Sequence, residues 1–199
     1  MQKTVHSGGA KGSDSLFSKI FNNHGYNVIH HSFKGHNINA KTGKPLIHST
    51  EELKTKNNVE ILKKLCLFLE KNYPKKEYIE KLLLRNIFQV KETNLILSIG
   101  NILNFDKGII EGGTGYAVAY GIINCQPILI FDQKNQNWFY SKDGNPFQLL
   151  NRKPIFEKLP NVFTAIGSRE LSKESVNEMY NCFSKKGKIS DISICSYNN

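Results

Sequence analysis

Two glycine-rich segments carry the residue types best suited to binding an anionic small molecule. The first is SGGAKGSD at residues 7–14, and the second is EGGTG at residues 111–115. Each follows a stretch with the pattern of a β-strand and precedes one with the pattern of a helix. Glycine lets backbone N–H groups approach an anion without steric hindrance, and a helix start adds the positive end of its dipole. The two segments therefore predict a site for a phosphate-bearing or ribose-bearing ligand.

The first segment offers backbone donors, a hydroxyl group and one cation. It matches neither the P-loop pattern nor the dinucleotide pattern G-x-G-x-x-G. Lys11 adds a point charge that suits phosphate, whereas the Asp14 carboxylate repels phosphate and suits a helix cap or a ribose hydroxyl. A purely structural tight turn is the alternative explanation. The ligand contacts expected here are Ser7, Gly8, Gly9, Ala10, Lys11 and Asp14.

The second segment combines backbone freedom with a hydroxyl that both donates and accepts. The ligand contacts expected here are Gly112, Gly113, Thr114 and Gly115. Small residues follow at Ala117, Ala119 and Gly121, and close packing of the helix on a sheet explains those better than a ligand does.

Two further clusters extend the predicted site. Arg85, Asn86 and Gln89 fall on one side of an otherwise apolar helix, and together they suit phosphate or base edges. An exposed surface position is the alternative for them. Gly167, Ser168 and Arg169 follow a buried strand, where ligands of parallel sheets bind. A simple surface pairing of Arg169 with Glu170 is the alternative there.

Histidines and cysteines have plainer explanations. His30 and His31 end a predicted strand near the first segment, where a hydrogen-bonded structural role is more common than a ligand contact. The four cysteines never form a C-x-x-C pair, so no metal site is expected. We expect buried, reduced thiols, with an exposed position for Cys195 in the polar tail.

Strands alternate with helices along the chain, which predicts an α/β fold with a doubly wound, mainly parallel sheet and helices on both faces. The apolar run at 94–99 is typical of a strand buried on both faces. Residues 1–187 are expected to form one domain, followed by a polar tail at 188–199. Residues 33–48 are expected to be a loop. The strands are expected at 4–6, 26–31, 94–99, 127–131 and 162–166, with a short edge strand at 138–140. The helices are expected at 13–23, 49–71 (opened by a Ser49–Glu52 capping box), 75–92, 116–123 and 173–185.

Composition limits the classes of partner. The 199 residues carry a formal charge of +10, from 27 Lys and Arg against 17 Asp and Glu. Arginine and aromatic residues are not concentrated among the lysines, so a solvated surface explains the charge better than a nucleic-acid groove. No run of about 18 apolar residues exists, so no membrane partner is expected. Because no apolar leader begins the chain, we expect a cytoplasmic setting.

The glycine segments resemble those of the SLOG superfamily, Rossmann-like proteins that include the DNA-processing protein A fold and the cytokinin-activating phosphoribohydrolases. SGGAKGSD is similar to the superfamily's SGGAxGAD loop, GGTG to its second glycine loop, and RNIFQV to a helix often found between them. In many relatives an IGSR strand comes first. Here AIGSREL stands at residues 165–171, so the chain looks like a circular permutant.

The resemblance implies binding of a nucleotide or a nucleotide-derived signal, by a sensor, carrier or sequestering protein. Viral or phage sequestration of a defence signal is one version. It also implies a homo-oligomer, with no cofactor. The phosphoribohydrolases read PGGxGTxxE, and the alignment places Ala119 at their glutamate, which puts their mechanism in doubt. The alternative is a nucleoside-phosphate N-glycosidase or related hydrolase that uses Asp14, Glu111 or Glu170. DNA binding is a third, weaker hypothesis.

Overall fold

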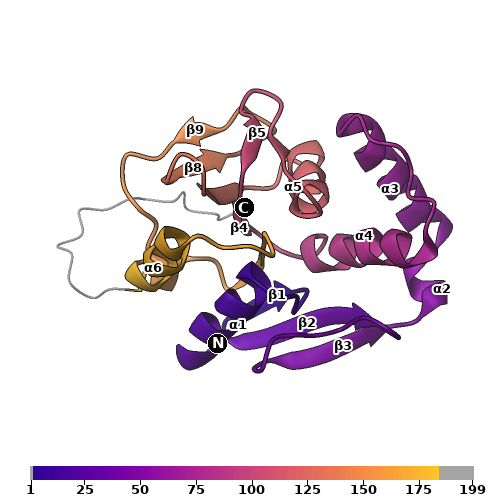
Figure 1. Ribbon diagram of the computed structural model, residues 1–199, viewed down its shortest axis with the longest axis horizontal. Helices are drawn as coiled ribbons and strands as arrows, with labels where there is room; N and C mark the ends of the chain where they lie inside the picture. Colours follow the sequence, from indigo (N-terminus) through magenta and orange to yellow (C-terminus); the bar gives the residue numbers. More distant parts are fainter. Residues whose placement is uncertain (1, 184–199) are drawn as a thin grey trace.

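The computed structural model describes residues 2–183, which form an α/β fold around an eight-stranded, mostly parallel sheet (Figure 1). The sheet order is β3-β2-β1-β10-β4-β7-β8-β9. The strands are β1 (Thr4–Ser7), β2 (Asn27–Phe33), β3 (Lys44–His48), β4 (Ile96–Gly100), β7 (Ile128–Asp132), β8 (Asn137–Ser141), β9 (Gln148–Leu149) and β10 (Val162–Gly167). A separate small hairpin consists of β5 (Ile102–Asn104) and β6 (Ile109–Ile110). The predicted fold class is therefore confirmed.

The strand β10 lies in the middle of the sheet, although it is the last strand along the chain. It pairs in parallel with β1 on one side and with β4 on the other. The strands from β3 to β7 all run parallel, and β8 and β9 add an antiparallel edge. The carboxyl ends of β1, β10, β4 and β7 therefore meet at one rim of the sheet.

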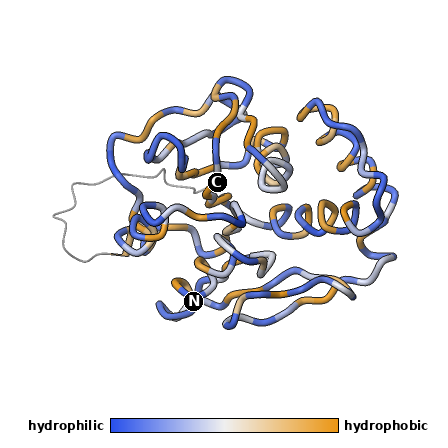
Figure 2. Tube along the Cα trace, viewed as in Figure 1, coloured by the Kyte–Doolittle hydropathy of each residue, from blue (hydrophilic) through white to orange (hydrophobic). Residues whose placement is uncertain are grey.

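Helices cover both faces of the sheet. The helices α1 (Ser13–Asn23) and α6 (Lys173–Asn181) pack on one face, against side chains such as Leu97 and Phe163. The helices α4 (Glu77–Val90) and α5 (Thr114–Ile123) cover the other face, against Ile96 and Ile128. The helices α2 (Thr50–Leu53) and α3 (Lys56–Phe68) complete that layer, and Figure 2 shows apolar and polar residues alternating along α3 and α4.

Several expected elements have different limits. The helix predicted over 49–71 is divided, because Thr55 caps a second helix and the Asn58 amide donates to the carbonyls of Glu52 and Leu53. The Ser49–Glu52 capping box is present and opens only the four-residue α2.

Three strand predictions were wrong or incomplete. Residues 33–48 were expected to be a loop, but β3 forms there as an exposed edge strand, which lacks the apolar alternation that marks a half-buried strand. β8 is not an edge strand, because β9 pairs with its outer side. The hairpin β5–β6 was not predicted, and it leads directly into the second glycine segment.

The cysteines divide by exposure. Cys66 and Cys182 are buried, as expected, but Cys125 is exposed in the turn after α5. Cys195, the polar tail and the expected end of the last helix lie outside the described residues. None of the helices at 2–183 is both long and apolar enough to span a membrane.

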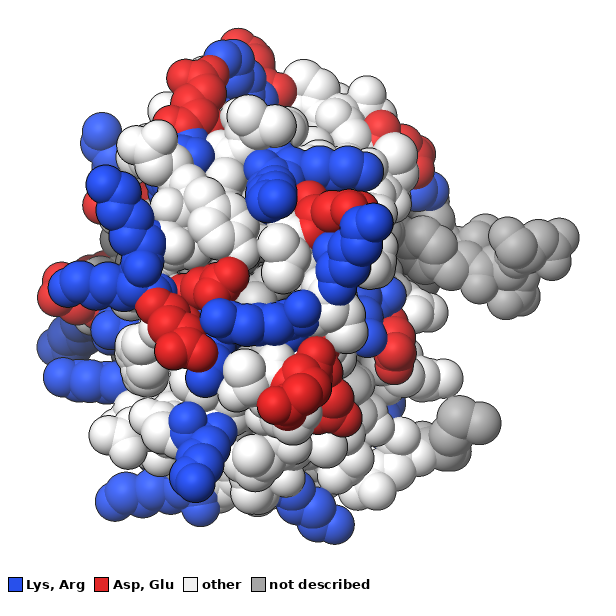
Figure 3. Space-filling view, turned by 90° about the vertical axis from the view of Figure 1, so that its right-hand side faces the viewer, with Lys and Arg blue, Asp and Glu red and all other residues white. Residues whose placement is uncertain are grey.

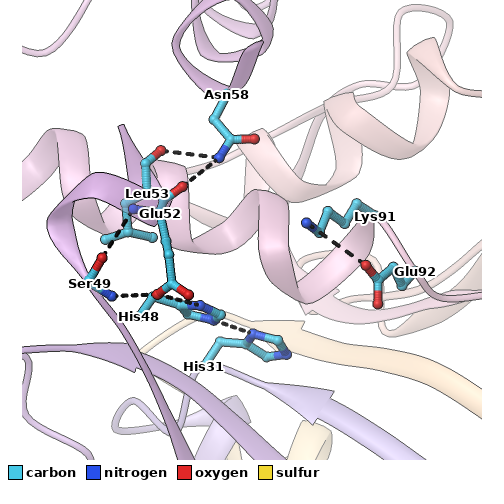
Figure 4. A network of polar contacts seen from close by, with 8 residues as sticks. All are labelled: His31, His48, Ser49, Glu52, Leu53, Asn58, Lys91 and Glu92. Atoms are coloured by element: carbon cyan, nitrogen blue, oxygen red, sulfur yellow. Dashed lines mark hydrogen bonds and ion pairs between the residues drawn. The ribbon is translucent and has the colours of Figure 1, made fainter. Parts of the chain in front are cut away.

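A stack of three histidines joins β1, β2 and β3 beneath α4. His6 Nδ1 lies 2.7 Å from His31 Nε2, and His31 Nδ1 lies 2.9 Å from His48 Nε2. Figure 4 shows the outer end of this stack, where His48 lies 4.0 Å from the Glu52 carboxylate. His30 points to the opposite face and contacts Ser18 and the Thr42 carbonyl. Both predicted strand-end histidines thus make structural hydrogen bonds.

The stack accepts few protons. Each N···N contact holds a single hydrogen atom. The three imidazoles can therefore keep both contacts only while they carry at most one positive charge in total. Burial lowers the pKa of His31 to about 3, with smaller contributions from the neighbouring His6 and His48. The pKa values of His6 and His48 are lowered by burial as well.

We predict that His31→Gln makes the protein less sensitive to acid. Below pH 6.5, His31 binds a proton in the unfolded chain but not in the folded protein. The free energy of unfolding of the wild type therefore falls as the pH drops from 7 to 5. The loss at pH 5 is about 2 kcal/mol for this one group. Urea unfolding at both pH values measures it, with His24→Gln as the exposed control. Parallel curves for wild type and His31→Gln would contradict the prediction.

Candidate ligand-binding cleft

A cleft of about 940 Å³ opens at the rim where the carboxyl ends of the central strands meet. Its walls come from the ends of β10 and β7, from α4, and from the first turns of α1 and α5. Most of the residues predicted from the sequence line it. These are Ala10, Asp14, Arg85, Asn86, Glu111, Gly112, Gly113, Thr114, Gly167, Ser168, Arg169 and Glu170.

The start of α5 faces this cleft without a capping side chain. Gly113 occupies the N-cap position and makes no side-chain hydrogen bond there. Apart from the glycine itself and its neighbours in the chain, no heavy atom of the described residues lies within 4 Å of the point where a Cβ on Gly112 or Gly113 would stand. The Asn86 amide donates to the Gly113 carbonyl at 3.3 Å and holds the turn against α4. Since the first N–H groups of a helix lack helical acceptors, this turn presents free donors to the cleft.

Asp14 and Arg85 form the floor of the cleft. The two residues are 3% and 5% exposed, respectively. Arg85 Nη1 and Asp14 Oδ2 lie 1.8 and 2.8 Å from the point where a Cβ on Gly8 would stand, so a side chain there would displace both groups from their present positions. None of the ion pairs among residues 2–183 joins Asp14 to Arg85, and their hydrogen bonds go to Ala10 and Gln89.

The partners of this pair leave part of its hydrogen-bonding capacity unused. Asp14 Oδ2 accepts from the Ala10 N–H at 3.3 Å, and Arg85 Nη1 donates to Gln89 Oε1. Asp14 Oδ1 and Arg85 Nε have no partner in the described part of the protein. Gln89 is fully buried and does not line the cleft, so it positions Arg85 from below.

Burial dominates the electrostatics of the floor. It raises the pKa of Asp14 to about 6, although the Arg85 charge and the N–H groups of Ala10, Gly167 and Gly8 oppose the shift. Burial also lowers the pKa of Arg85, and the Asp14 carboxylate opposes that shift. A guanidinium stays protonated at neutral pH. The cleft floor therefore holds a fixed cation beside a carboxyl group that titrates near pH 6.

The first glycine segment uses most of its donors internally. The Gly9 N–H binds Ser7 Oγ at 3.2 Å, and the Ser13 N–H binds the Ser168 carbonyl at 3.0 Å. Gly9 packs against His30 and Ile38. Of the residues predicted in this segment, only Ala10 and Asp14 line the cleft, whereas Ser7, Gly8, Gly9 and Lys11 do not. The segment encloses Asp14 and does not form an open row of N–H donors.

Gly115 of the second segment also lies away from the cleft. A Cβ at this position would stand 2.3 Å from the Ile110 carbonyl oxygen, so this glycine allows α5 to pack closely on β6.

Three carboxylates predicted as catalytic candidates line the cleft: Asp14, Glu111 and Glu170. Glu111 accepts from the Asn101 amide at 2.8 Å, and the Glu170 carbonyl accepts from Gln133 at 3.2 Å. Ala119, aligned with the glutamate of the phosphoribohydrolases, is fully buried in the core between α3, α4 and α5. It therefore lies outside the cleft.

Sequence reasoning missed part of the cleft wall. Asn101 and Gln133 come directly after β4 and β7, so the rule that ligands bind beyond the carboxyl ends of parallel strands could have found them. Most of the apolar part of the wall gave no such signal, because Ile79, Leu82, Leu83 and Tyr116 belong to the apolar stripes of α4 and α5. The missed residues are Lys71, Ile79, Leu82, Leu83, Asn101, Tyr116, Gln133, Lys134, Ile166, Leu171 and Ser172.

Comparisons with protein-family models, with curated proteins and with solved structures find no match to this chain. Its function is therefore inferred from the geometry of the cleft.

We predict that Asp14→Asn changes how stability depends on pH. The folded protein keeps a proton on Asp14 between pH 4 and pH 6 that the unfolded chain has lost, so this group destabilises the fold as the pH rises. Between pH 4 and pH 7.5, the free energy of unfolding of the variant should therefore rise by roughly 2–3 kcal/mol relative to that of the wild type.

Urea unfolding at these two pH values measures the difference. Asp106→Asn, which removes an exposed carboxylate, is the matched control. A stability difference between Asp14→Asn and wild type that stays constant with pH would show that Asp14 titrates normally.

Proposed function

We propose that this protein binds a nucleotide or a nucleotide-derived molecule in the cleft, with a phosphate at the start of α5. One observation carries the proposal: an uncapped helix start with two unobstructed glycines opens onto the same cleft as the nearly buried Arg85. Backbone N–H groups and a guanidinium are the donors that proteins use for phosphate.

The rest of the cleft wall supports a ligand that is larger than phosphate. Ile79, Leu82 and Leu83 supply an apolar wall, and Lys71 lies 5.3 Å from the centre of the Tyr116 ring. An apolar wall with a few convergent polar groups is typical of small-molecule sites, and their volumes are about 300–1,000 Å³. A base or another flat group fits this wall, while the polar end holds the phosphate.

The resemblance to the SLOG superfamily points in the same direction. The permutation that it implies needs the IGSR strand beside the SGGA strand, and β10 pairs with β1 in that way. A sensor, carrier or sequestering protein, including a viral or phage one, would need only this binding site.

Hydrolysis of the bound nucleotide is the second candidate, since Asp14, Glu111 and Glu170 all line the cleft. General acid–base catalysis by a positioned carboxylate contributes about 10²–10⁴-fold in rate. DNA is a weaker candidate. The face in Figure 3 carries interspersed basic and acidic groups and does not form a continuous basic surface. Some of the lysines are paired with carboxylates, such as Lys54 with Glu77 at 3.5 Å and with Glu80 at 2.8 Å. A homo-oligomer remains part of the proposal.

We predict that Arg85→Ala weakens binding of a nucleoside monophosphate by about 1.5–3 kcal/mol, because a charge-assisted hydrogen bond is lost. Calorimetric titration against a panel of nucleoside monophosphates and cyclic dinucleotides measures the effect. Lys11→Ala, which removes a cation outside the cleft, should leave affinity unchanged. Equal affinities of wild type and a folded Arg85→Ala protein would refute the role of Arg85.

We predict that Gly113→Val abolishes binding and leaves the fold intact. Gly113 has φ −72° and ψ −27°, which valine adopts readily, and the added side chain would point into open space that the phosphate needs. Thermal unfolding should show a midpoint close to that of the wild type. An affinity of Gly113→Val equal to that of the wild type would show that the phosphate does not bind beside Gly113.

We predict that the wild type returns its ligand unchanged. The protein is incubated with the same panel and denatured, and the small molecules are separated by liquid chromatography. Recovery of intact nucleotide supports a binding protein. Release of free base would instead establish the hydrolase, and Asp14→Asn, Glu111→Gln and Glu170→Gln would then identify its acid.

A further inference from the structure

The edge strand β3 is attached to the sheet by a single buried side chain. Its first four residues, Lys44 to Ile47, are exposed, and only His48 is buried. β3 pairs with β2 alone, because its outer side has no partner strand in the described sheet. The contact between His48 and His31 of β2 is therefore the main side-chain attachment of this strand, and its other bonds to the sheet belong to the backbone ladder.

The His48 ring is enclosed by three elements. It stacks on the His31 ring, with the centroids 5.2 Å apart and the planes inclined by 12°, and the facing nitrogens lie 2.9 Å apart. The Phe88 ring of α4 lies 4.3 Å from the His48 ring, centroid to centroid. Figure 4 shows Glu52 of α2 beside His48. His48 is thus held between β2, α2 and α4, with little access to water.

The geometry of the stack limits the number of protons that it can hold. Between His31 and His48, one nitrogen carries a hydrogen and the facing nitrogen must offer its lone pair. The same holds for the contact between His6 and His31. One added proton can be held at an outer nitrogen of the stack. A second added proton would place hydrogens on both nitrogens of one contact, so that contact would have to open.

The charged groups that face the stack lie on α2, on α4 and just after α4. They are Glu52, Arg85, Lys91 and Glu92. Burial is the largest influence on His48 and lowers its pKa, and the Glu52 carboxylate opposes this shift while the two cations reinforce it. His48 therefore binds a proton more weakly in the closed sheet than it would in a strand that is open to water.

We propose that the His31–His48 contact is a pH-sensitive switch, which releases β3 from the sheet in mild acid while the central strands stay folded. Once β3 has moved away, His48 is open to water and takes up a proton near its ordinary pKa of about 6.5. The released state binds more protons than the closed state, so the closed state dominates at pH 7 and release increases as the pH falls below 6.5. β3 is the strand that moves, because β1 is held on both sides, by β10 and by β2. This inference does not depend on the ligand of the cleft.

Amide hydrogen exchange followed by NMR at pH 7 and pH 5 tests this switch, after correction for the intrinsic exchange rate at each pH. The amides of β3 that bond to β2 report release of the strand, and the amides of β4 report unfolding of the whole protein. We expect the opening constant of β3 to exceed that of β4 at both pH values. For one proton taken up on release, it should rise about tenfold from pH 7 to pH 5.

A matched pair of variants assigns the pH dependence to the stack. The amide of His48→Gln can still bond to His31 but does not titrate, so we expect this variant to reduce the rise severalfold. His24→Gln, which removes an exposed histidine outside the stack, should preserve it. A full rise in a folded His48→Gln protein would overturn the role of His48.

Two results on the wild type alone would overturn the proposed release of β3. One is an opening constant of β3 that stays the same at pH 7 and pH 5. The other is equal opening constants for β3 and β4 at pH 5, since β3 would then leave only when the whole protein unfolds. Neither comparison needs a variant, so both remain decisive if His48→Gln does not fold.

Discussion

A buried aspartate and a buried arginine that converge without pairing are the constraint on which the cleft depends. Removing either charge from water is costly, and attraction between neighbouring opposite charges only partly compensates. The remaining compensation comes from fixed partners: backbone N–H groups around Asp14, and Gln89 beneath Arg85. Gly8 leaves the space that the guanidinium occupies, since a side chain there would displace Arg85 from its present position. The first glycine segment is shaped by this requirement, which explains why it encloses a carboxylate.

The central position of β10 brings these groups together. Asp14 follows β1, Ser168 follows β10, Asn101 follows β4 and Gln133 follows β7, and these strands are neighbours in the parallel sheet. The contacts between the loops then stabilise the rim. Ser13 binds the Ser168 carbonyl, and Gln133 accepts from the Ser172 N–H at 3.0 Å. A strand near the end of the described chain, with the loop that follows it, thus completes a site whose other parts come from residues 10–134.

The two glycine segments have different physical roles despite similar composition. In the second, an open helix start retains its donors, since no side chain caps it. In the first, the donors are used by Ser7, Asp14 and Ser168.

The histidines of the sheet are divided between its two faces. The stack of His6, His31 and His48 lies under α4 and joins the edge strand β3 to the sheet, while His30 faces α1.

The sequence by itself determined the α/β class, the parallel central strands and most of the polar residues at the cleft. These follow from local signals, namely apolar runs, glycine turns and strand ends, which act over a few residues. Only the tertiary structure decided that Gln89 supports Arg85 from below, that Ser7 and Gly9 turn away, and that β3 pairs at the sheet edge. Those outcomes depend on contacts between residues distant in the chain, such as Arg85 over Gly8, and no local pattern encodes them. The same physical reason explains why apolar residues such as Ile79 and Leu83 were not recognised as cleft wall, because an apolar stripe has the same pattern whether it faces a core or a ligand.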